Sequence, residues 1–527
     1  MNTKPQPANL GLRKRMIVNT ISNYGKMIIG IIVTIFLTRI LFLGLSREEY
    51  GFWALLWSIF GYSLLLDFGF GASIQKYTSE TVVSKDWERY NRIVSTVFFN
   101  YVMFAVLIMI AAIVLSMNLQ HLFSFSPENE QYFRKIMIIF GIGSAIVFPF
   151  GFFTEVLRGL QKMHARNLIQ TGAMMISFAG MVLMIHFKIN LIGMAFVAIG
   201  TNLLACLTMM FFVHRLMPEF RIRLRFYDRS LLQSVMGFSV YAYLITFTNL
   251  IILKTDQVVI SIFGSVALVA IYQISIRLAD TYQRFSAQFL DNLGPVSATL
   301  FAAGNKSKMA DIMLQSNRLM GIISTLLMIP LLMYVKPLLN IWLGLNDTAG
   351  MICAIILIYS MYILLFFRSS SVYILLMANE QKILAKIAIA EALANLGLSI
   401  LLIKTMPDIL AYWNIHLQNS AIIGVALGTF IPNLLFAIFF NIPKACEFSG
   451  IGIWEYLRTT VLRTFLIGIS TFAFAFLLYA WSYPQRLITI FFYFIMVATY
   501  YMALTVTLGL EPWEKGQLLD FIRKRVL

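Results

Sequence analysis

The stretch of sequence that decides the fold runs from Asn249 to Lys306, NLIILKTDQVVISIFGSVALVAIYQISIRLADTYQRFSAQFLDNLGPVSATLFAAGNK. It contains two apolar runs joined by a short turn, which predicts a helical membrane hairpin. The second arm carries polar side chains at steps of three and four, which places them on one face of a helix. They are Gln273, Arg277, Asp280, Arg284, Gln288 and Asp291. At 1.5 Å rise per residue this polar stripe is about 27 Å long, close to the thickness of a bilayer's hydrocarbon core. Because charged groups are costly in hydrocarbon, we expect the stripe to line a water-filled cavity or the interior of a helix bundle.

The composition of the whole chain agrees with a membrane protein. Of its 527 residues, 59% are hydrophobic and only 12% are charged, with a mean hydropathy of +0.80. In soluble proteins about a quarter of residues are charged. The net charge of +17 is compatible with nucleic-acid binding, but basic residues in membrane proteins collect in cytoplasmic loops. The cysteines, Cys206, Cys353 and Cys446, show neither a disulfide pattern nor metal-ligand spacing.

Apolar runs of about 20 residues predict an all-α polytopic fold with about fourteen spans. They lie near 17–44, 51–75, 93–116, 136–157, 168–187, 190–213, 232–263, 267–292, 314–335, 350–377, 383–403, 416–440, 460–480 and 487–510. With a cytoplasmic N-terminus, 28 Lys and Arg fall on inside segments and 7 on outside segments. This asymmetry predicts that both termini are cytoplasmic, and it accounts for most of the basic excess without nucleic acid. The first run is long enough to span, so we expect an uncleaved anchor.

A weak internal repeat predicts two pseudo-symmetric six-helix lobes around a central cavity. Each half has a long span, a short outer turn, a Tyr at the start of the next span and an acidic end that contains glycine. We expect an N-terminal lobe at 1–213, a basic cytoplasmic linker at 214–231 and a C-terminal lobe at 232–440. Residues 441–527 would hold a cytoplasmic loop, an appended pair of spans and the tail. The basic linker is compatible with a solvated segment facing lipid headgroups or with a partner-docking role.

Charged side chains inside the predicted spans are the candidates for function. The basic ones are Lys26, Arg39, Lys254, Arg277, Arg284 and Arg368, and the acidic ones are Asp67, Glu155, Asp256, Asp280, Asp291 and Glu391. Lys26, Arg277 and Arg284 fall near mid-membrane, whereas Asp67, Glu155 and Asp291 fall near cytoplasmic ends. A cationic pocket at mid-depth suits an anionic group such as a phosphate.

Structural alternatives remain open for the residues of the stripe. Asp280 is spaced to form helix-face ion pairs with Arg277 or Arg284, so the stripe is either a substrate site or a structural seam. Lys254 and Asp256 lie two apart and therefore point to different partners.

Alternatives also remain for charges near the ends of spans. Arg39 and Arg368 could simply reach lipid headgroups with their long side chains. Asp67, in the sequence LDFGFG, is compatible with a helix end beside flexible glycines or with a gating role.

Nothing in the sequence favours an enzyme. There is no phosphate-cradling glycine loop, no nucleophile elbow and no metal-spaced cluster, and the five histidines are scattered. The longest outside segment, near 117–135, is too short to form a catalytic domain. We therefore expect no catalytic residues, no metal site and no cofactor beyond a coupling proton or sodium ion.

Several segments resemble a known family of transporters. They are EEYGFWALLWSIFGYSLLLDFGFGASIQKY after the first span, TDQVVISIFGSVALVAIYQISIRLAD and LGPVSATLFAAGNKSKM in the centre, and PLLNIWLG at Pro337–Gly344. They are similar to the polysaccharide-transporter branch, the Wzx-type flippases, of the multidrug/oligosaccharidyl-lipid/polysaccharide (MOP) exporter superfamily. The resemblance covers most of residues 15–440. It implies two six-span lobes around a cavity that opens alternately inward and outward. The acids interleaved with the cavity cations depart from a simple anion pocket.

The resemblance implies a flippase in the bacterial cytoplasmic membrane. Its substrate would be an undecaprenyl-diphosphate-linked oligosaccharide repeat unit of an O-antigen, capsule or exopolysaccharide. A polysaccharide polymerase and a chain-length regulator would be possible partners, and nucleic acid would not. The expected substrate-binding residues are Lys26, Arg39, Lys254, Asp256, Asp280, Arg277, Arg284 and Arg368, with Asp67 and Asp291 as gating residues. A lipid II flippase and an ion-coupled drug antiporter of the MATE type, with twelve spans and an acidic pocket, are the alternatives.

Overall fold

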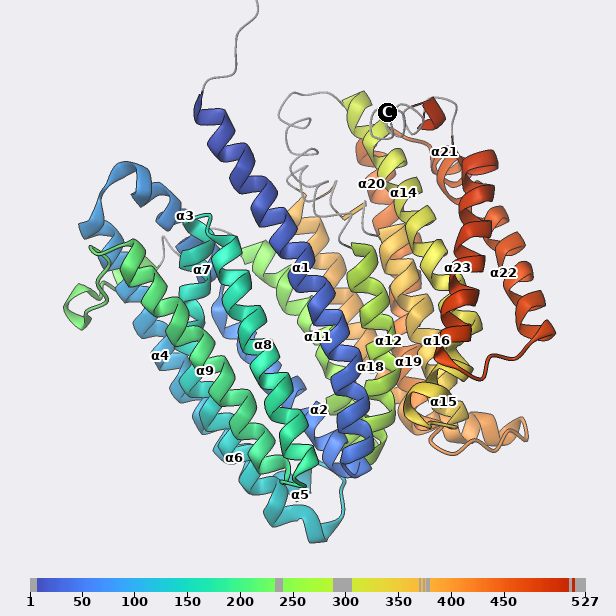
Figure 1. The fold of residues 1–527 in the computed structure, drawn as a ribbon, viewed down its shortest axis with the longest axis horizontal. Helices are drawn as coiled ribbons and strands as arrows, with labels where there is room; N and C mark the ends of the chain where they lie inside the picture. The colour runs from blue at the N-terminus through green and yellow to red at the C-terminus, as the bar shows by residue number, and fades with distance from the viewer. Residues whose placement is uncertain are drawn as a thin grey trace, which may run out of the picture. The chain divides into compact units, whose positions relative to one another are not determined.

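The computed structural model describes residues 7–232, 240–287, 306–368, 371–372, 375, 380–510 and 514–516. These residues form helices and connecting loops without any strand (Figure 1). Eleven of the described helices are long and apolar enough to cross a membrane, or up to thirteen when two bent pairs each count as one span. The helix Val266–Ala287 is not among them because the polar stripe lowers its hydropathy. Each of the fourteen predicted segments is helical over most of its described residues, which confirms an all-α polytopic fold.

The chain divides into two compact units, Met1–Leu250 with Gly264–Ala270, and Ile251–Phe263 with Ile271–Leu527. Two helices contribute to both units, α11 (Val240–Phe263) and α12 (Val266–Ala287). The first unit otherwise consists of α1 (Pro7–Gly44), α2 (Arg47–Gly61), η1 (Tyr62–Asp67), α3 (Phe70–Ser84), α4 (Trp87–Met117), α5 (Leu119–Leu122), η2 (Pro127–Asn129), α6 (Glu130–Val147), η3 (Phe148–Gly151), α7 (Phe152–Gly159), α8 (Met163–His186), α9 (Leu191–Leu216) and η4 (Leu224–Phe226).

The second unit is built mainly from the helices that follow α12. They are α14 (Lys306–Met333), α15 (Val335–Leu343), α16 (Thr348–Ile363), η6 (Leu364–Arg368), α18 (Gln381–Tyr412), α19 (Ala421–Phe436), η7 (Ala437–Asn441), α20 (Ile442–Ser449), α21 (Ile453–Tyr456), η8 (Leu457–Leu462), α22 (Arg463–Trp481), α23 (Leu487–Leu504) and η9 (Thr505–Gly509). The last two apolar segments, predicted as an appended pair, pack on α14 of this unit. The predicted lobe boundaries stay a prediction.

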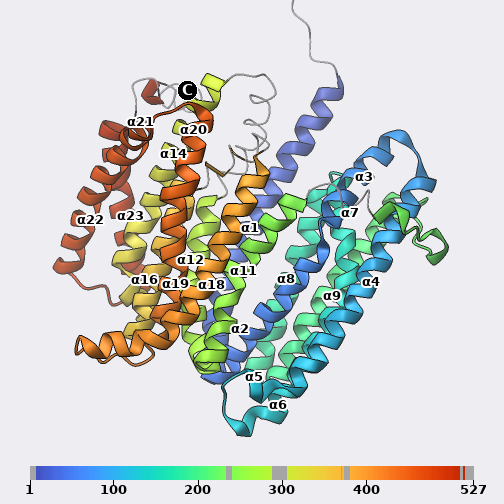
Figure 2. The same ribbon diagram turned by 180° about the vertical axis from the view of Figure 1, so that it is seen from behind.

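Within the first unit, α1 packs along α8, while α4, α6 and α9 form a contiguous group of helices (Figures 1 and 2). At one end of this group an apolar cluster joins α3, α4, α7 and α9, with Phe152, Phe153 and Val156 almost inaccessible. This packing holds α7 firmly, and α7 carries two of the charged side chains of the site described below.

The second predicted span is broken at the LDFGFG sequence. Its two parts, Arg47–Asp67 and Phe70–Ser84, meet at an angle of 49°. Phe68 and Gly69 both adopt left-handed backbone conformations, with φ of 45° and 80°. The strain at Phe68 is unusual for a non-glycine residue. Asp67 is the last residue of η1, so the backbone agrees with the interpretation of Asp67 as a residue at a helix end.

In the second unit, α18 and α19 pack so closely that glycine is required between them. A Cβ atom added at Gly428 would lie 2.4 Å from Ser399 Oγ, and one added at Gly424 would lie 2.3 Å from the Leu402 carbonyl oxygen. This close approach brings the polar side chains Asn395 and Thr429 of the two helices into contact, at 3.0 Å.

Candidate functional site

The first unit contains a cluster of charges from four helical elements, α1, η1, α7 and α8. Lys26 of α1 lies near Arg158 of α7 and Arg166 of α8, close enough for their charges to repel. Glu155 of α7 pairs with Arg158 at 3.0 Å and also attracts Arg166. Asp67 lies near Glu155, so the two carboxylates repel each other. The three cations outnumber the two acids, and all five side chains are at least partly withdrawn from solvent.

A polar seam between α1 and α8 places Lys26 in this cluster. Asn19, Asn23 and Lys26 follow one another at steps of three and four on α1, and they face His164, Asn167 and Gln170 of α8. The Lys26 ammonium donates to Gln170 Oε1, and Asn167 Nδ2 donates to Asn23 Oδ1 at 2.5 Å. The backbone N–H of His164 donates to Asn19 Oδ1 at 3.2 Å. Lys26 thus occupies one position in a fixed network between two helices.

Asp67 stabilises the break in the second span. Its Oδ1 accepts hydrogen bonds from the backbone N–H of Gly71, at 3.1 Å, and from the hydroxyl of Tyr101 on α4. The carboxylate thus satisfies a free N–H group at the start of α3, as helix-capping side chains do. The gating role expected for Asp67 stays a prediction.

The second unit contains a second cationic cluster, formed by α11 and α12. Asp280 attracts Arg277, Arg284 and Lys254, and Lys254 is in turn repelled by the two arginines. In the amide orientation that satisfies its neighbours, the Gln273 side-chain oxygen accepts from Arg277 Nε at 3.0 Å. The described part of the stripe therefore places two arginines beside one carboxylate, and Lys254 joins them from the neighbouring helix as the third cation.

Asp256 lies apart from this cluster in a neutral polar environment. It is 1% exposed, and its Oδ2 accepts from the Tyr272 hydroxyl and, at 3.0 Å, from Thr429 Oγ1. Its Oδ1 has no hydrogen-bond partner among the described residues, nor do the buried oxygens Asn395 Oδ1 and Ser399 Oγ. A buried carboxylate without a cationic partner is costly, so a proton or a small cation is expected to balance its charge.

The remaining predicted site residues have different surroundings. Arg368 forms an ion pair of 2.5 Å with Glu391 of α18, and the two side chains are 12% and 2% exposed. Its guanidinium is therefore paired inside the second unit. The alternative in which Arg368 reaches out to lipid headgroups does not apply. Arg39 of α1 is half-buried. Asp291 and Gln288 lie outside the described residues, so the gating role expected for Asp291 stays a prediction.

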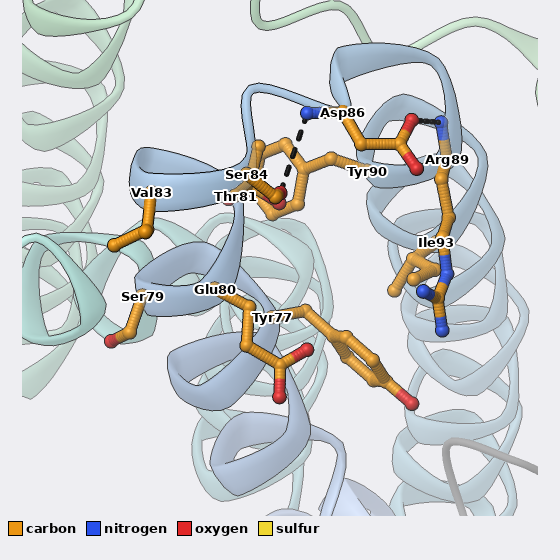
Figure 3. A pocket seen from close by; sticks show the side chains of 10 residues that line it. All are labelled: Tyr77, Ser79, Glu80, Thr81, Val83, Ser84, Asp86, Arg89, Tyr90 and Ile93. Atoms are coloured by element: carbon orange, nitrogen blue, oxygen red, sulfur yellow. Dashed lines mark hydrogen bonds between the residues drawn. The ribbon is translucent and has the colours of Figure 1, made fainter.

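A hollow of about 630 Å³ lies in the first unit between the end of α3 and the start of α4 (Figure 3). Tyr77 and Glu80 of α3 line it together with Arg89 of α4. Asp86 caps α4 by accepting from the Arg89 N–H at 3.1 Å, and its own N–H donates to Ser84 Oγ at 3.4 Å. None of the predicted substrate-binding residues lines this hollow.

Sequence analysis did not identify Arg158 and Arg166 as site residues. Both lie between two predicted spans, where basic residues are expected in a cytoplasmic loop, but the turn between α7 and α8 brings them beside Lys26. A spacing signal was available, because Glu155 and Arg158 stand three apart on one helix face. Asn395 and Thr429 were missed as well, because isolated polar residues in apolar helices carry no charge signal.

Several solved structures of membrane transporters share this fold. The lipid II flippase MurJ, in an inward closed conformation, is similar over 97% of this chain and 100% of its own, with a TM-score of 0.69 and 13% identity. An inward-facing multidrug MATE transporter of the MOP superfamily is similar over 81% of this chain and 95% of its own, with a TM-score of 0.59 and 14% identity. A MOP superfamily transporter from Pyrococcus furiosus, whose binding pocket is described as having reverse polarity, covers 85% of this chain and 96% of its own, with a TM-score of 0.54 and 15% identity.

The family can also be stated. The chain belongs to the polysaccharide biosynthesis protein family, whose model matches residues 36–346, more than half of the chain. The family agrees with the predicted resemblance to polysaccharide transporters, and the fold is shared with structures of the MOP superfamily. The similar structures are themselves described as a flippase and a multidrug transporter. A search among curated proteins found no match.

Proposed function

We propose that this protein is a flippase that moves undecaprenyl-diphosphate-linked oligosaccharide repeat units across the bacterial cytoplasmic membrane by alternating access. The observation that carries the proposal is the cluster of Lys254, Arg277 and Arg284 around the carboxylate of Asp280. Among these four side chains the positive charges outnumber the negative one, within helices that belong in a membrane. Such an excess is costly unless an anion compensates it.

A diphosphate matches this excess in charge and in geometry. Arg277 and Arg284 can each engage phosphate oxygens through a planar fork, and Lys254 can act as a point charge. We assign the same substrate chemistry to the cluster of Lys26, Arg158 and Arg166 in the first unit, where the cations also exceed the acids. Arg158 and Arg166 thereby join the candidate substrate-binding residues.

The orientation belongs to the proposal as well. The predicted split of 28 basic residues inside against 7 outside supports cytoplasmic termini in the inner membrane. The sugars would occupy an aqueous cavity while the polyprenyl tail stays in lipid. A polysaccharide polymerase and a chain-length regulator are candidate partners because the translocated repeat unit is the substrate for polymer assembly.

Asp256 is our candidate for ion coupling. Its unpaired Oδ1 lies in a buried region with the unpaired oxygens of Asn395 and Ser399, and such oxygens suit a proton or a sodium ion. A cation bound at Asp256 would lie apart from the side chains proposed to bind the diphosphate, because the electrostatic partners of Asp280 do not include Asp256.

Lipid II is the second candidate substrate. The MurJ structure is similar over 97% of this chain, whereas the MATE and Pyrococcus furiosus transporters cover 81% and 85%. The full-length similarity favours a flippase of the MurJ type over a drug antiporter. It does not separate lipid II from an oligosaccharide-linked lipid, since both carry the same diphosphate.

The variant Arg277→Ala tests the proposal in a host that depends on this protein for surface polysaccharide. We expect loss of the polymer and accumulation of the lipid-linked precursor, with unchanged expression and melting temperature. Arg277→Lys should restore part of the activity because it keeps the charge, and the exposed Lys336→Gln serves as a control. Normal polymer from Arg277→Ala would refute the proposed site, and accumulation of lipid II in its place would identify the second candidate.

A further inference from the structure

The basic segment between α9 and α11 is held against the first unit over its described length. Directly after α9, Met217 and Phe220 are each 2% exposed. Phe220 packs against Phe152 and Phe153, with ring centroids 6.3 and 6.0 Å apart. The segment therefore begins with two apolar anchors in the core of the unit.

A series of hydrogen bonds then attaches its backbone to α4. Asn91 donates to the Glu219 carbonyl at 2.9 Å and accepts from the Arg221 N–H at 2.9 Å. Ser95 Oγ, one turn further along α4, accepts from the Arg223 N–H at 3.1 Å. These contacts fix the backbone from residue 219 to 223.

The end of the segment is attached in the same way. Thr96 Oγ1 accepts from the Asp228 N–H at 3.0 Å, and the Asp228 carboxylate pairs with Arg92 at 2.5 Å. Hydrogen bonds from Ser230 and the charge of Arg92 lower the pKa of Asp228, so this attachment persists at neutral and mildly acidic pH. This segment, residues 214–230, is therefore fixed against α4 at the end of the membrane helix α9, and we call it the ledge.

The outer surface of this ledge is basic and partly apolar. Its arginines are all exposed, and no carboxylate of the described residues lies within 4.0 Å of them. They are Arg215, Arg221, Arg223, Arg225 and Arg229. Leu224 and Tyr227, between them in sequence, are 69% and 40% exposed. Exposed apolar side chains among unpaired arginines are typical of surfaces that lie in the interface of an anionic membrane.

We propose that the ledge His214–Ser230 is a binding surface for anionic phospholipid headgroups. The arginines engage the phosphates, while Leu224 and Tyr227 insert between neighbouring headgroups. Attachment to α4 holds the arginines in place before lipid arrives, which reduces the entropy lost on binding. The ledge is separate from the charge clusters assigned to transport, and the inference holds whichever substrate is moved.

The test uses the purified full-length protein and phosphatidylglycerol in detergent micelles, with phosphatidylcholine as the comparison lipid. Native mass spectrometry counts the lipids bound, and the melting temperature reports their effect. Each basic charge near an anionic surface corresponds to about a fivefold change in affinity. We therefore expect Arg221→Gln/Arg223→Gln/Arg225→Gln to weaken phosphatidylglycerol binding about a hundredfold.

Two further variants make the test specific. Lys336→Gln/Lys382→Gln/Lys386→Gln removes the same charge from exposed lysines elsewhere and should weaken binding much less. Asn91→Ala/Ser95→Ala keeps every arginine but removes the hydrogen bonds that fix the backbone from residue 219 to 223, and it should give an intermediate loss. Equal losses in both charge variants, or no preference for phosphatidylglycerol over phosphatidylcholine in the parent protein, would overturn the proposal. Unchanged binding by Asn91→Ala/Ser95→Ala would overturn the role of the fixed backbone.

Discussion

Two charged groups inside the second unit differ in their balance. Arg368 and Glu391 form a pair with one charge of each sign, 2.5 Å apart and almost closed to solvent. Asp280, in contrast, faces three cations, Lys254, Arg277 and Arg284. A balanced pair is complete by itself, whereas the second group retains capacity for an anion. The balance of charge therefore distinguishes the two groups: Arg368 and Glu391 form an ion pair that supports the fold, whereas the group around Asp280 is a candidate binding site.

The largest effect is expected from breaking the balanced pair. Glu391→Ala leaves the Arg368 guanidinium buried and unpaired, which should lower the unfolding free energy by about 3 kcal/mol or more. Thermal and denaturant unfolding in detergent measure this loss. The matched double variant Arg368→Met/Glu391→Leu should recover most of the stability, because both charges are removed together. Full stability of Glu391→Ala would show that the pair is not structural.

An intermediate effect is expected from removing the single acid of the cationic cluster. Asp280→Asn removes the negative charge that attracts the three cations, which should lower stability by about 1 kcal/mol and tighten binding of a lipid diphosphate about tenfold. The physical reason is that the carboxylate competes with phosphate for the same cations. Titration calorimetry with a soluble polyprenyl diphosphate analogue measures the binding. Lower stability without tighter binding would favour the alternative of a structural ion-pair seam.

The smallest change in stability is expected at Asp256, the buried acid without a cation. Asp256→Asn keeps the shape and the hydrogen bonds from Tyr272 and Thr429, so stability should change by less than about 1 kcal/mol. Transport should lose its dependence on a proton or sodium gradient, because the amide cannot carry the balancing charge. Flipping assays in vesicles with imposed gradients measure this. Wild-type gradient dependence in the variant would exclude Asp256 as the coupling group.

Hydrophobic periodicity and charge spacing predicted the helices well. The apolar runs predicted where the long helices of the described residues lie, since a span needs about 20 apolar residues and few other folds tolerate them. The steps of three and four in the second arm placed Arg277, Asp280 and Arg284 on one face of α12, because that periodicity follows from the helix itself. The glycines of LDFGFG marked the position at which the second span breaks.

Contacts between distant segments could not be predicted in the same way. Arg368 and Glu391 are 23 residues apart, and a buried pair looks the same in sequence as two charges that reach lipid headgroups. Arg166 joins Lys26 only because α8 packs along α1. The predicted linker at 214–231 proved to be attached to α4 through the short polar side chains Asn91, Ser95 and Thr96, which carry no recognisable spacing signal.

The sequence by itself thus determined the membrane class, the helices and the polar stripe, because each depends on residues that are near neighbours along the chain. Only the tertiary structure decided how the charges are shared. Arg368 and Glu391 pair one to one, three cations surround Asp280, and among the described residues no cation faces Asp256. The reason is that the cost of a buried charge depends on which side chains other helices bring within a few ångströms of it.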